Sequence, residues 1–465
     1  MLGYLVSAIK AEWLVYRTSK LYLQFGLPVA IATVIGAIVN LHYNVQSSGS
    51  IRIVSVVVLT TGIVAVGYKI LVWYLKGSVV DRYLLQPVED QLRSDTLRIL
   101  KVLALSKGWR SDNYGSGQGL TNVTLNQNIC TGGFDPQLEV ASGDWLAWRQ
   151  YDDDLRRFAI YHAFNKSGHV FNDDKIRLAG ELESRGAEKA TVQKTDYLSS
   201  IMTDQFRWDM VRSKRTAPDG ETAAHLLWDG RSAIWRDGSG ASPGRIVSIG
   251  ESPTSNQLGA STLAFSRDGH LMIVSQSSKG LQSPDMLAPS GSGSFDWSDI
   301  KASGAAKIMQ LIRYGANREL QEECALGDDK RRRGKIASDV LPFAFVRMIH
   351  RVGKPEFYAL GKIDAVAGVL RNRWPYDRYV EEVLVGGIDP IIVGGGGEIS
   401  ESILKACSQY LDARSDKTNK IGRLPMSFPL EHGLHLLREA CSNRESASAI
   451  NVFMQSGYII ETVVH

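Results

Sequence analysis

The chain contains few cysteines for its length. Only four of its 465 residues are cysteines, and Cys130, Cys324, Cys407 and Cys441 are widely separated. No pair has the Cys-x-x-Cys spacing of a zinc site or redox motif, and the separations do not indicate a disulfide framework. We therefore expect a protein of a reducing compartment.

The net charge is small, and no glycine motif has the spacing of a nucleotide-binding loop. The formal net charge is only +4 at neutral pH, whereas a nucleic-acid-binding domain usually carries a large basic excess. The glycines at 394–397 follow an apolar run, but they lack the Gly-x-Gly-x-x-Gly spacing and a following Lys-Ser or Lys-Thr pair. We expect no nucleic-acid partner, and we favour a flexible loop at this point.

Long apolar runs are concentrated in the first 75 residues. Residues 21–43 and 51–75 each contain about twenty mainly apolar residues, the length that a transmembrane helix needs. The loop between them is short, so both ends of this hairpin are expected on one side of a membrane. Residues 1–20 have apolar side chains at helical spacing and predict an amphipathic juxtamembrane segment. A buried hairpin in a soluble core is the alternative.

Basic residues predict the orientation of this hairpin. Lys10, Arg17 and Lys20 precede it, and Lys76 and Arg82 follow it. The positive-inside rule then places both termini and the soluble domain in the cytoplasm. We expect a two-pass protein of the inner (cytoplasmic) membrane, with the lipid bilayer as a partner. The helical segment predicted after the hairpin suits either a homo-oligomer contact or a simple stalk.

One stretch, residues 304–326, concentrates carboxylates: GAAKIMQLIRYGANRELQEECAL. If it is helical, Glu319, Glu322 and Glu323 stand at i, i+3 and i+4 and share one face. Arg318 offsets only part of their repulsion, so a hard divalent cation such as Mg²⁺ or Mn²⁺ is expected to bind them. A solvated helix face is the alternative, because most charge runs have that role.

This stretch resembles the signature of the Nudix hydrolase family, which is Gly, five residues, Glu, seven residues, then Arg-Glu-aliphatic-any-Glu-Glu-any-Gly-aliphatic. Every spacing from Gly304 to Leu326 is kept. Gln310 stands where the family has a Glu that mainly orients the Arg, and Ala325 stands where it has Gly. The change at Ala325 matters if the helix ends in a left-handed residue, because Gly adopts that conformation freely and Ala does not.

The flanking sequence follows the order of elements in that family. Strands predicted at 258–265 and 271–274, joined by an Asp-Gly hairpin turn, precede the stretch, and strands predicted at 340–349 and 357–363 follow it. The Gly- and Ser-rich residues 288–294 are expected to form a loop whose amides can approach phosphate. The resemblance implies an α+β chain with a Nudix-type α/β/α sandwich domain behind an N-terminal transmembrane helical hairpin.

The rest of the chain carries no comparable motif, and residues 111–245 do not indicate a particular fold. Residues 110–143 are rich in Gly, Ser, Asn and Thr and are expected to form loops. Helices are predicted at 155–164, 197–212, 400–413, 434–442 and 446–455. The predicted segments are an amphipathic segment at 1–20, transmembrane helices at 21–43 and 51–75, a helical connector at 76–110, an accessory cytosolic region at 111–245, the Nudix-like domain at 246–370 and a mostly helical extension at 371–465.

The resemblance also implies a reaction, the hydrolysis of the pyrophosphate linkage in a nucleoside diphosphate derivative. Glu322 and Glu323 are expected as the principal metal ligands and Glu319 as a ligand or the base. Arg318 is expected to hold Glu322 in place. Glu356, Glu381 and Glu382 are candidates for an extra carboxylate outside the signature.

A second function stays open at this stage. A membrane hairpin fused to a nucleotide-binding domain also resembles membrane effectors of bacterial antiphage signalling, in which the Nudix-like domain would be a nucleotide sensor. The retained glutamates favour the hydrolase, because a pure sensor has no evident need of three carboxylates beside a phosphate. A scaffold without a ligand is the third alternative.

Overall fold

Two compact units make up the chain. Unit 1 comprises Met1–Pro87, Trp148–Asn172 and Asp209–Asp229, and unit 2 comprises Val88–Ala147, Asp173–Trp208 and Gly230–His465. The computed structural model describes residues 83–86, 108–114, 117–167, 172–182, 188–206, 208–216, 222–238, 244–278, 283–326, 335–371, 380–385, 390–391, 398–412 and 424–456.

The predicted fold class requires a correction. The described part of the chain is mixed α+β, and none of its helices is long and apolar enough to cross a membrane. A sandwich behind a transmembrane hairpin is therefore the wrong description of this structure. The amphipathic segment at 1–20 and the apolar runs at 21–43 and 51–75 lie outside the described residues.

The predicted helical connector also differs from the structure where it is described, because Tyr83–Gln86 forms the strand β1. Pro87 disfavours helical backbone at the residue before it. Pairing with β7 (Met210–Thr216) provides hydrogen-bond partners for the backbone of β1.

Unit 1 contains a three-stranded antiparallel sheet in the order β1-β7-β8, in which β8 is Thr222–Asp229. Its helix α7 (Asp153–Ser167) begins with acidic residues, as expected for a first turn. The ring of Phe158 on α7 lies 5.4 Å from that of Tyr83 on β1, so the helix packs on the sheet. The short helix α6 (Ala147–Gln150) precedes α7.

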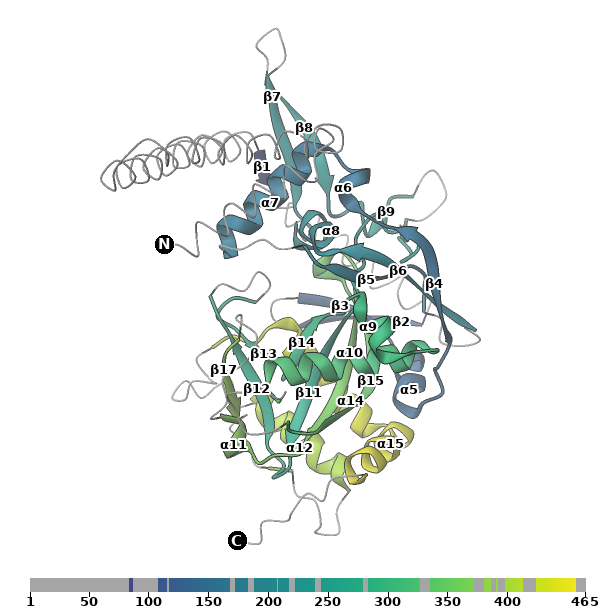
Figure 1. Ribbon diagram of the computed structural model, residues 1–465, viewed down its shortest axis with the longest axis vertical. Coiled ribbons are helices and arrows are strands. Elements are labelled where there is room, and N and C mark those ends of the chain that lie inside the picture. Colours follow the sequence, from purple (N-terminus) through teal and green to yellow (C-terminus); the bar gives the residue numbers. More distant parts are fainter. Residues whose placement is uncertain are drawn as a thin grey trace, which may run out of the picture. The chain divides into compact units, whose positions relative to one another are not determined.

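Nine strands form the main sheet of unit 2. Seven follow the order β13-β12-β11-β16-β15-β3-β2, with β14 paired to β11 and β17 paired to β12 (Figure 1). β11 and β16 run parallel, and the other pairs are antiparallel. The strands are β2 (Trp109–Tyr114), β3 (Gly117–Asn122), β11 (Gly259–Ser266), β12 (Leu271–Gln276), β13 (Leu287–Ala288), β14 (Gly291–Ser294), β15 (Ser338–Met348), β16 (Lys354–Ile363) and β17 (Val380–Val385).

The strands predicted around the carboxylate stretch are confirmed. β11 and β12 form the expected hairpin, and Gly269 adopts φ 80° in its turn, a conformation that Gly reaches at low cost. β15 and β16 pair over most of their lengths. All eight residues of β11 are buried, which explains its nearly continuous run of apolar and small residues.

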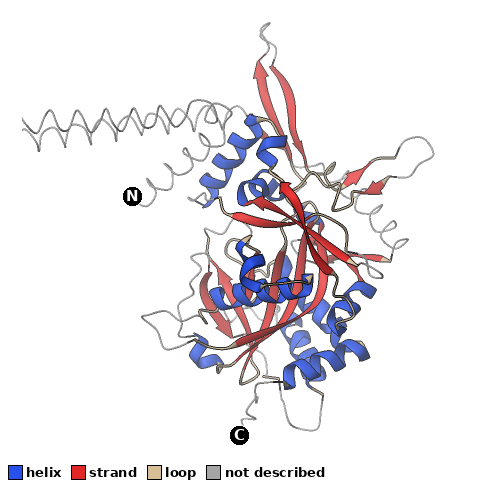
Figure 2. Cartoon of the chain, turned by 45° about the vertical axis from the view of Figure 1, so that its right-hand side comes forward, coloured by secondary structure: helices blue, strands red, loops and turns tan. Residues whose placement is uncertain are grey.

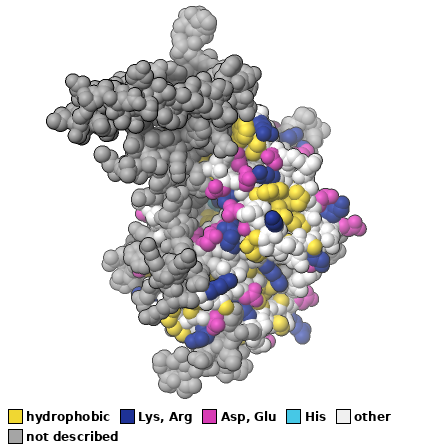
Figure 3. All heavy atoms as spheres, viewed as in Figure 1, with side chains coloured by type: hydrophobic (Ala, Val, Ile, Leu, Met, Phe, Trp, Pro, Cys, Tyr) yellow, Lys and Arg dark blue, Asp and Glu magenta, His cyan; other side chains and the backbone are white. Residues whose placement is uncertain are grey.

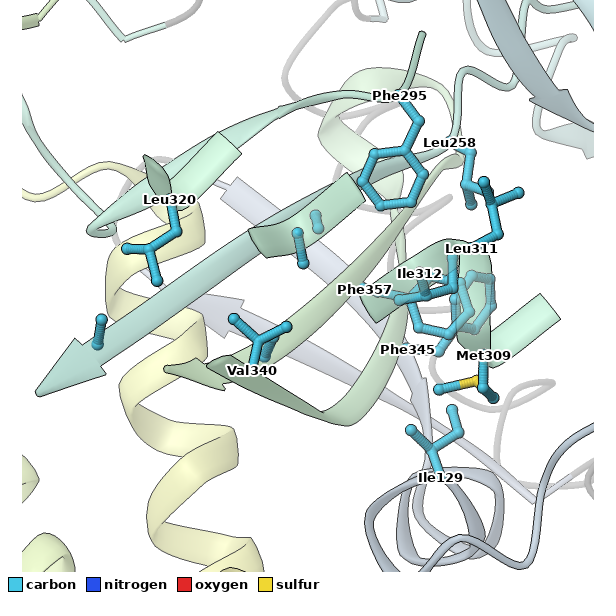
Figure 4. Packing of buried hydrophobic residues seen from close by; sticks show 14 of the residues in the cluster. Ile129, Leu258, Phe295, Met309, Leu311, Ile312, Leu320, Val340, Phe345 and Phe357 are labelled. Atoms are coloured by element: carbon cyan, nitrogen blue, oxygen red, sulfur yellow. The ribbon is translucent and has the colours of Figure 1, made fainter. Parts of the chain in front are cut away.

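Helices cover both faces of the main sheet (Figures 1 and 2). On one face, α5 (Val123–Thr131) and α10 (Ile308–Glu323) share a core with the strands, in which Ile312 and Leu320 belong to the same cluster as Phe345 and Phe357 (Figure 4). On the other face lie α12 (Ile399–Asp412), α14 (Phe428–Ser442) and α15 (Arg444–Gln455), which share a second core with the strands. The helices predicted near 400–413, 434–442 and 446–455 are thus confirmed.

A smaller sheet of unit 2 contains a strand, β5, that lies beside the segment between β14 and α9. It has the order β4-β6-β5, with β4 at Gln137–Asp144, β5 at Asp174–Leu178 and β6 at Lys189–Asp196. The amide of Ile176 on β5 donates to the carbonyl of Phe295 at 3.1 Å, and the amide of Leu258 donates to the carbonyl of Ile176 at 2.9 Å. β5 therefore runs beside the segment that leads from β14 into α9 (Ser298–Ser303).

Other short elements complete unit 2. The helix predicted at 197–212 is wrong beyond its first part, because α8 ends at Met202 and β7 begins at Met210. The remaining elements are α8 (Tyr197–Met202), η2 (Asp204–Phe206), β9 (Trp235–Arg236), β10 (Arg245–Ile246), η3 (Ile349–Arg351) and α11 (Ala367–Arg371).

Two strands of the main sheet, β2 and β3, come from residues 109–122. β2 and β3 come from residues expected to be loops, yet they extend the main sheet beside β15. Their glycines have a packing reason. A Cβ on Gly117 would lie 2.5 Å from the Phe428 ring, and one on Gly119 would lie 2.9 Å from the His432 ring. Composition alone suggested a loop because it does not show which glycines face a closely packed helix.

Acidic and basic side chains are interspersed over the coloured part of the face shown in Figure 3. This distribution agrees with the small net charge of the chain.

Candidate functional site

Helix α10 carries the carboxylate stretch, and Gln310 caps its start. The Gln310 Oε1 atom accepts hydrogen bonds from the amides of Ala306 at 2.9 Å and Lys307 at 3.2 Å. These amides belong to the two residues that precede Ile308, the first residue of α10, so the side chain bonds back to the start of the helix. The Gln310 side-chain oxygen is therefore used for capping, which agrees with the expectation that Gln at this position orients Arg318 less well than the Glu of the family.

The three glutamates of α10 do not share one environment. Glu319 is 8% exposed and Glu323 is 2% exposed, so both continue the buried stripe formed by Ile312 and Ala316. The Glu322 side chain is 49% exposed. Successive helical residues are separated by about 100°, so Glu319 and Glu323 lie close in direction while Glu322 points away from Glu323.

The three predicted metal ligands differ in their exposure to solvent. Within the described ranges, no group of three or more His, Cys, Asp or Glu side chains is placed to hold a metal ion. The predicted ligands are brought onto one helix, but the helical turn divides them into a buried pair and an exposed third member.

Strand β14 lies directly against the buried pair. A Cβ on Gly291 would lie 2.5 Å from the Leu320 Cα atom, and a Cβ on Gly293 would lie 2.2 Å from the Glu319 Oε2 atom. Ser292 on the same strand donates to Glu323 Oε1 at 3.4 Å. The glycines expected to form a phosphate loop thus form a strand whose missing side chains leave room for α10 and for the Glu319 carboxylate.

Arg318 is the centre of the polar contacts at this site. Its Nε and Nη2 atoms donate to the two carboxylate oxygens of Asp299, each at 3.1 Å. Nη2 also donates to Glu319 Oε1 at 2.9 Å, and Nη1 donates to Glu322 at 3.2 Å. The predicted contact between Arg318 and Glu322 is confirmed.

Sequence reasoning missed Asp299, together with Asp296 and Lys175. Asp296 Oδ2 lies 3.6 Å from Arg318 Nη2, and Lys175 Nζ donates to Asp296 Oδ1. The two aspartates stand three residues apart at the start of α9, a spacing typical of a helix N-terminus, and the Asp296 amide donates to Asp299 Oδ2 at 3.0 Å. That spacing could have indicated a capping pair, whereas the sequence offers no comparable signal for Lys175.

Among the residues that the structure describes, carboxylates outnumber cations in this cluster. Arg318 contacts four carboxylates, and Lys175 contacts one of these, Asp296. Burial raises the pKa of Glu319 from 4.5 to about 7; the Arg318 charge opposes this increase, and Glu322 adds to it. Although burial lowers the pKa of Arg318, the neighbouring carboxylates raise it well above its usual value.

The candidates for an extra carboxylate do not join the cluster where they are described. Glu356 accepts from Lys354 Nζ and, at 2.7 Å, from Ser261 Oγ. Its neighbour Phe357 belongs to the core shared with α10, so strand alternation places Glu356 on the other face. Glu382 stands next to Val383, which belongs to that same core, so strand alternation also places Glu382 on the other face. The Glu381 side chain lies outside the description.

The donor set suits a hard cation that phosphate helps to bind. Mg²⁺ is commonly held by one or two carboxylates plus water and substrate phosphate oxygens rather than by a complete protein cage. Glu319 and Glu323 provide two such carboxylates one helical turn apart, and Glu319 lies in the space that a Cβ on Gly293 would fill. The described residues fit this partial site.

The other face of the sheet holds a second buried polar cluster. Asp112 accepts from Arg110 Nε at 2.7 Å and lies 3.1 Å from His432 Nε2, while Arg110 also donates to both oxygens of Glu439 at 2.7 Å. His435 stacks on Tyr114 with ring centroids 4.1 Å apart. The Tyr114 ring also lies 5.3 Å from the His432 ring, so both histidines contact this tyrosine.

Comparison of the sequence with protein-family models found no match, and none was found among curated proteins.

Proposed function

We propose that the chain is a hydrolase of the Nudix type that cleaves the pyrophosphate linkage of a nucleoside diphosphate derivative with Mg²⁺ or Mn²⁺. The observation that carries the proposal is the pair of buried carboxylates, Glu319 and Glu323, that stand one helical turn apart at the end of α10 beside strand β14. Burying ionised carboxylates is unfavourable unless charge or hydrogen bonds compensate, so this arrangement in a core helix would favour a bound cation.

Under this proposal, Glu319 and Glu323 hold the metal together with phosphate oxygens, and Glu322 contributes from the exposed side. A bound metal ion neutralises charge on the phosphate oxygens and lowers the pKa of a bound water. Arg318 keeps the Glu319 and Glu322 carboxylates in fixed positions, as a residue beside a metal ligand commonly does.

The substrate class follows from charge. A pyrophosphate linkage is shielded by its own negative oxygens, so a site with excess carboxylates accepts it only when cations accompany it. In the reaction, water forms the new phosphorus–oxygen bond, the bridging bond breaks, and a carboxylate or the leaving phosphate takes the proton. Glu319, Glu322 and Glu323 are the carboxylates proposed for this site.

The test is product release by the full-length chain. It is assayed with Mg²⁺, Mn²⁺ or EDTA against a panel of nucleoside diphosphate conjugates and cyclic oligonucleotides. We expect metal-dependent turnover that falls by about 10²- to 10³-fold in Glu323→Gln, with a nearly unchanged melting temperature. Glu445→Gln is the matched control, because Glu445 is an exposed helical glutamate bonded to Gln127.

Full activity in Glu323→Gln would refute the site assignment. Metal-dependent nucleotide binding without any turnover would replace the hydrolase proposal with a nucleotide-sensing function. Absence of both turnover and binding across the panel would overturn both proposals.

A further inference from the structure

We propose that Asp299 is the positioning residue of this site, fixing the Arg318 guanidinium so that it aligns Glu319 and Glu322. The inference rests on the proposed function for its catalytic consequence. Its structural part concerns only residues of this chain and can be tested without substrate.

The contact between Asp299 and Arg318 is bidentate. Both oxygens of Asp299 accept from Arg318, through Nε and Nη2 at 3.1 Å each. Two parallel hydrogen bonds fix the plane of a guanidinium as well as its position. The outer edge of Arg318 is then directed at Glu319 and Glu322.

Asp299 is also the partner whose own position is best defined. Its side chain is 3% exposed, compared with 33% for Asp296 and 49% for Glu322. Its Oδ2 atom accepts from the Asp296 amide, so the carboxylate is tied to the backbone at the start of α9. An exposed glutamate on a long side chain provides less restraint, because it retains more rotamer freedom.

Position 310, where the Nudix family has a Glu that mainly orients the Arg, is Gln in this chain. The Gln310 oxygen accepts from the amides of Ala306 and Lys307, which directly precede α10. Asp299 lies outside the carboxylate stretch, on the helix that precedes it, and supplies the negative charge that Gln310 lacks. The brace for Arg318 therefore comes from α9.

The first experiment measures proton exchange of the Arg318 Nε–H group by NMR in the full-length protein. We expect slow exchange in the unaltered protein and faster exchange in Asp299→Ala. Asp296→Ala is the matched control, because it removes a nearby carboxylate that lies 3.6 Å from Nη2 rather than one bonded to Nε. Fast exchange in the unaltered protein would overturn the inference without requiring any variant to fold.

The second experiment compares kcat, KM and Mn²⁺ affinity in Asp299→Asn and Asp299→Glu. Loss of an outer partner of a metal ligand commonly reduces metal affinity or activity by about 10- to 100-fold. We expect such a loss in Asp299→Asn, mainly in kcat and Mn²⁺ affinity, with partial recovery in Asp299→Glu. Unchanged kcat and Mn²⁺ affinity in Asp299→Asn would overturn the positioning role.

The two proposals fail in different ways. If the unaltered protein shows no turnover, the proposed hydrolase function fails, and the Nε–H exchange still decides whether Asp299 positions Arg318. If turnover is present and insensitive to Asp299, the hydrolase proposal stands and this inference is refuted.

Discussion

Each face of the main sheet in unit 2 buries a carboxylate, but the pKa of the carboxylate shifts in opposite directions on the two faces. On the face of α14, Asp112 receives hydrogen bonds from Arg110 and Thr121 and contacts His432. Although burial raises the pKa of Asp112, these hydrogen bonds hold it below its usual value. On the face of α10, burial raises the pKa of Glu319 to about 7 despite the contact with Arg318.

The difference lies in whether ionisation of the buried carboxylate stabilises the fold. Hydrogen bonds from Arg110 and Thr121 and the contact with His432 outweigh the effect of burial on Asp112, so ionised Asp112 stabilises the fold. At Glu319, burial and the neighbouring Glu322 outweigh the contact with Arg318, so ionised Glu319 destabilises the fold. Replacing the acid with its amide should therefore change the stability of the fold in opposite directions at Asp112 and at Glu319.

Glu319 gives the largest expected effect. Its native pKa of about 7 exceeds the unfolded value of 4.5, so the native state binds this proton more tightly. The resulting stability is fully present below the unfolded pKa and is lost as the pH rises through 7. In EDTA, the free energy of unfolding should fall by roughly 3 kcal/mol over this range relative to Glu319→Gln. Urea unfolding at several pH values measures it, and parallel profiles for the two proteins would contradict the comparison.

Asp112→Asn should have the opposite sign. The native pKa of Asp112 is lowered, so its stabilisation is present above the unfolded value of 3.8 and is lost as the pH falls through the native pKa. At neutral pH we expect the variant to lose about 3 kcal/mol, because a buried charge cluster loses its central member. Asp135→Asn, which removes an exposed partner of Lys307, is the control and should change stability by less than about 1 kcal/mol. Equal effects of the two changes would show that the Asp112 cluster contributes no more than a surface pair.

Gly291→Ala tests the close seating of α10 on β14. The added Cβ would lie 2.5 Å from the backbone of Leu320, so the helix must shift. We expect a loss of about 2 kcal/mol in thermal or urea unfolding. Gly180→Ala is the control, since a Cβ at Gly180 would meet nothing within 4 Å. If both variants were equally stable, α10 would not be packed as closely as the structure describes.

Ala325→Gly should have the smallest effect. Ala325 adopts φ 54°, a left-handed conformation that costs a residue with a Cβ roughly 1–2 kcal/mol. Its methyl group is buried, and removing it costs about 0.8 kcal/mol. The net expectation is a gain of up to about 1 kcal/mol in the free energy of unfolding. A clear destabilisation would show that the buried methyl outweighs the backbone strain.

The sequence predicted the local elements around the site. Apolar spacing and the Asp-Gly turn identified the hairpin of β11 and β12, because side-chain period and turn chemistry act over a few residues. The left-handed conformation considered for Ala325 is present, because Ala325 adopts φ 54° just after α10. The pairing of Arg318 with Glu322 followed from their i, i+4 spacing.

Composition failed where long-range packing decides the structure. The glycines of β3 and β14 suggested loops, but they are strand residues that face Phe428 and Glu319 at distances no side chain would permit. Glycine near a turn and glycine beneath a helix look the same in a sequence. The burial of Glu319 and the exposure of Glu322 likewise depend on where β14 lies.

The sequence by itself determined which carboxylates and which arginine stand on one helix, because their spacing is fixed by covalent connection and the helical repeat. Only the tertiary structure decided their environments. It brought Asp299 to Arg318 and Lys175 to Asp296, over separations of 19 and 121 residues. It also buried Glu319 while balancing Asp112 on the other face. Such contacts depend on chain folding that places distant charges together, and their electrostatic consequences follow from burial rather than from residue type.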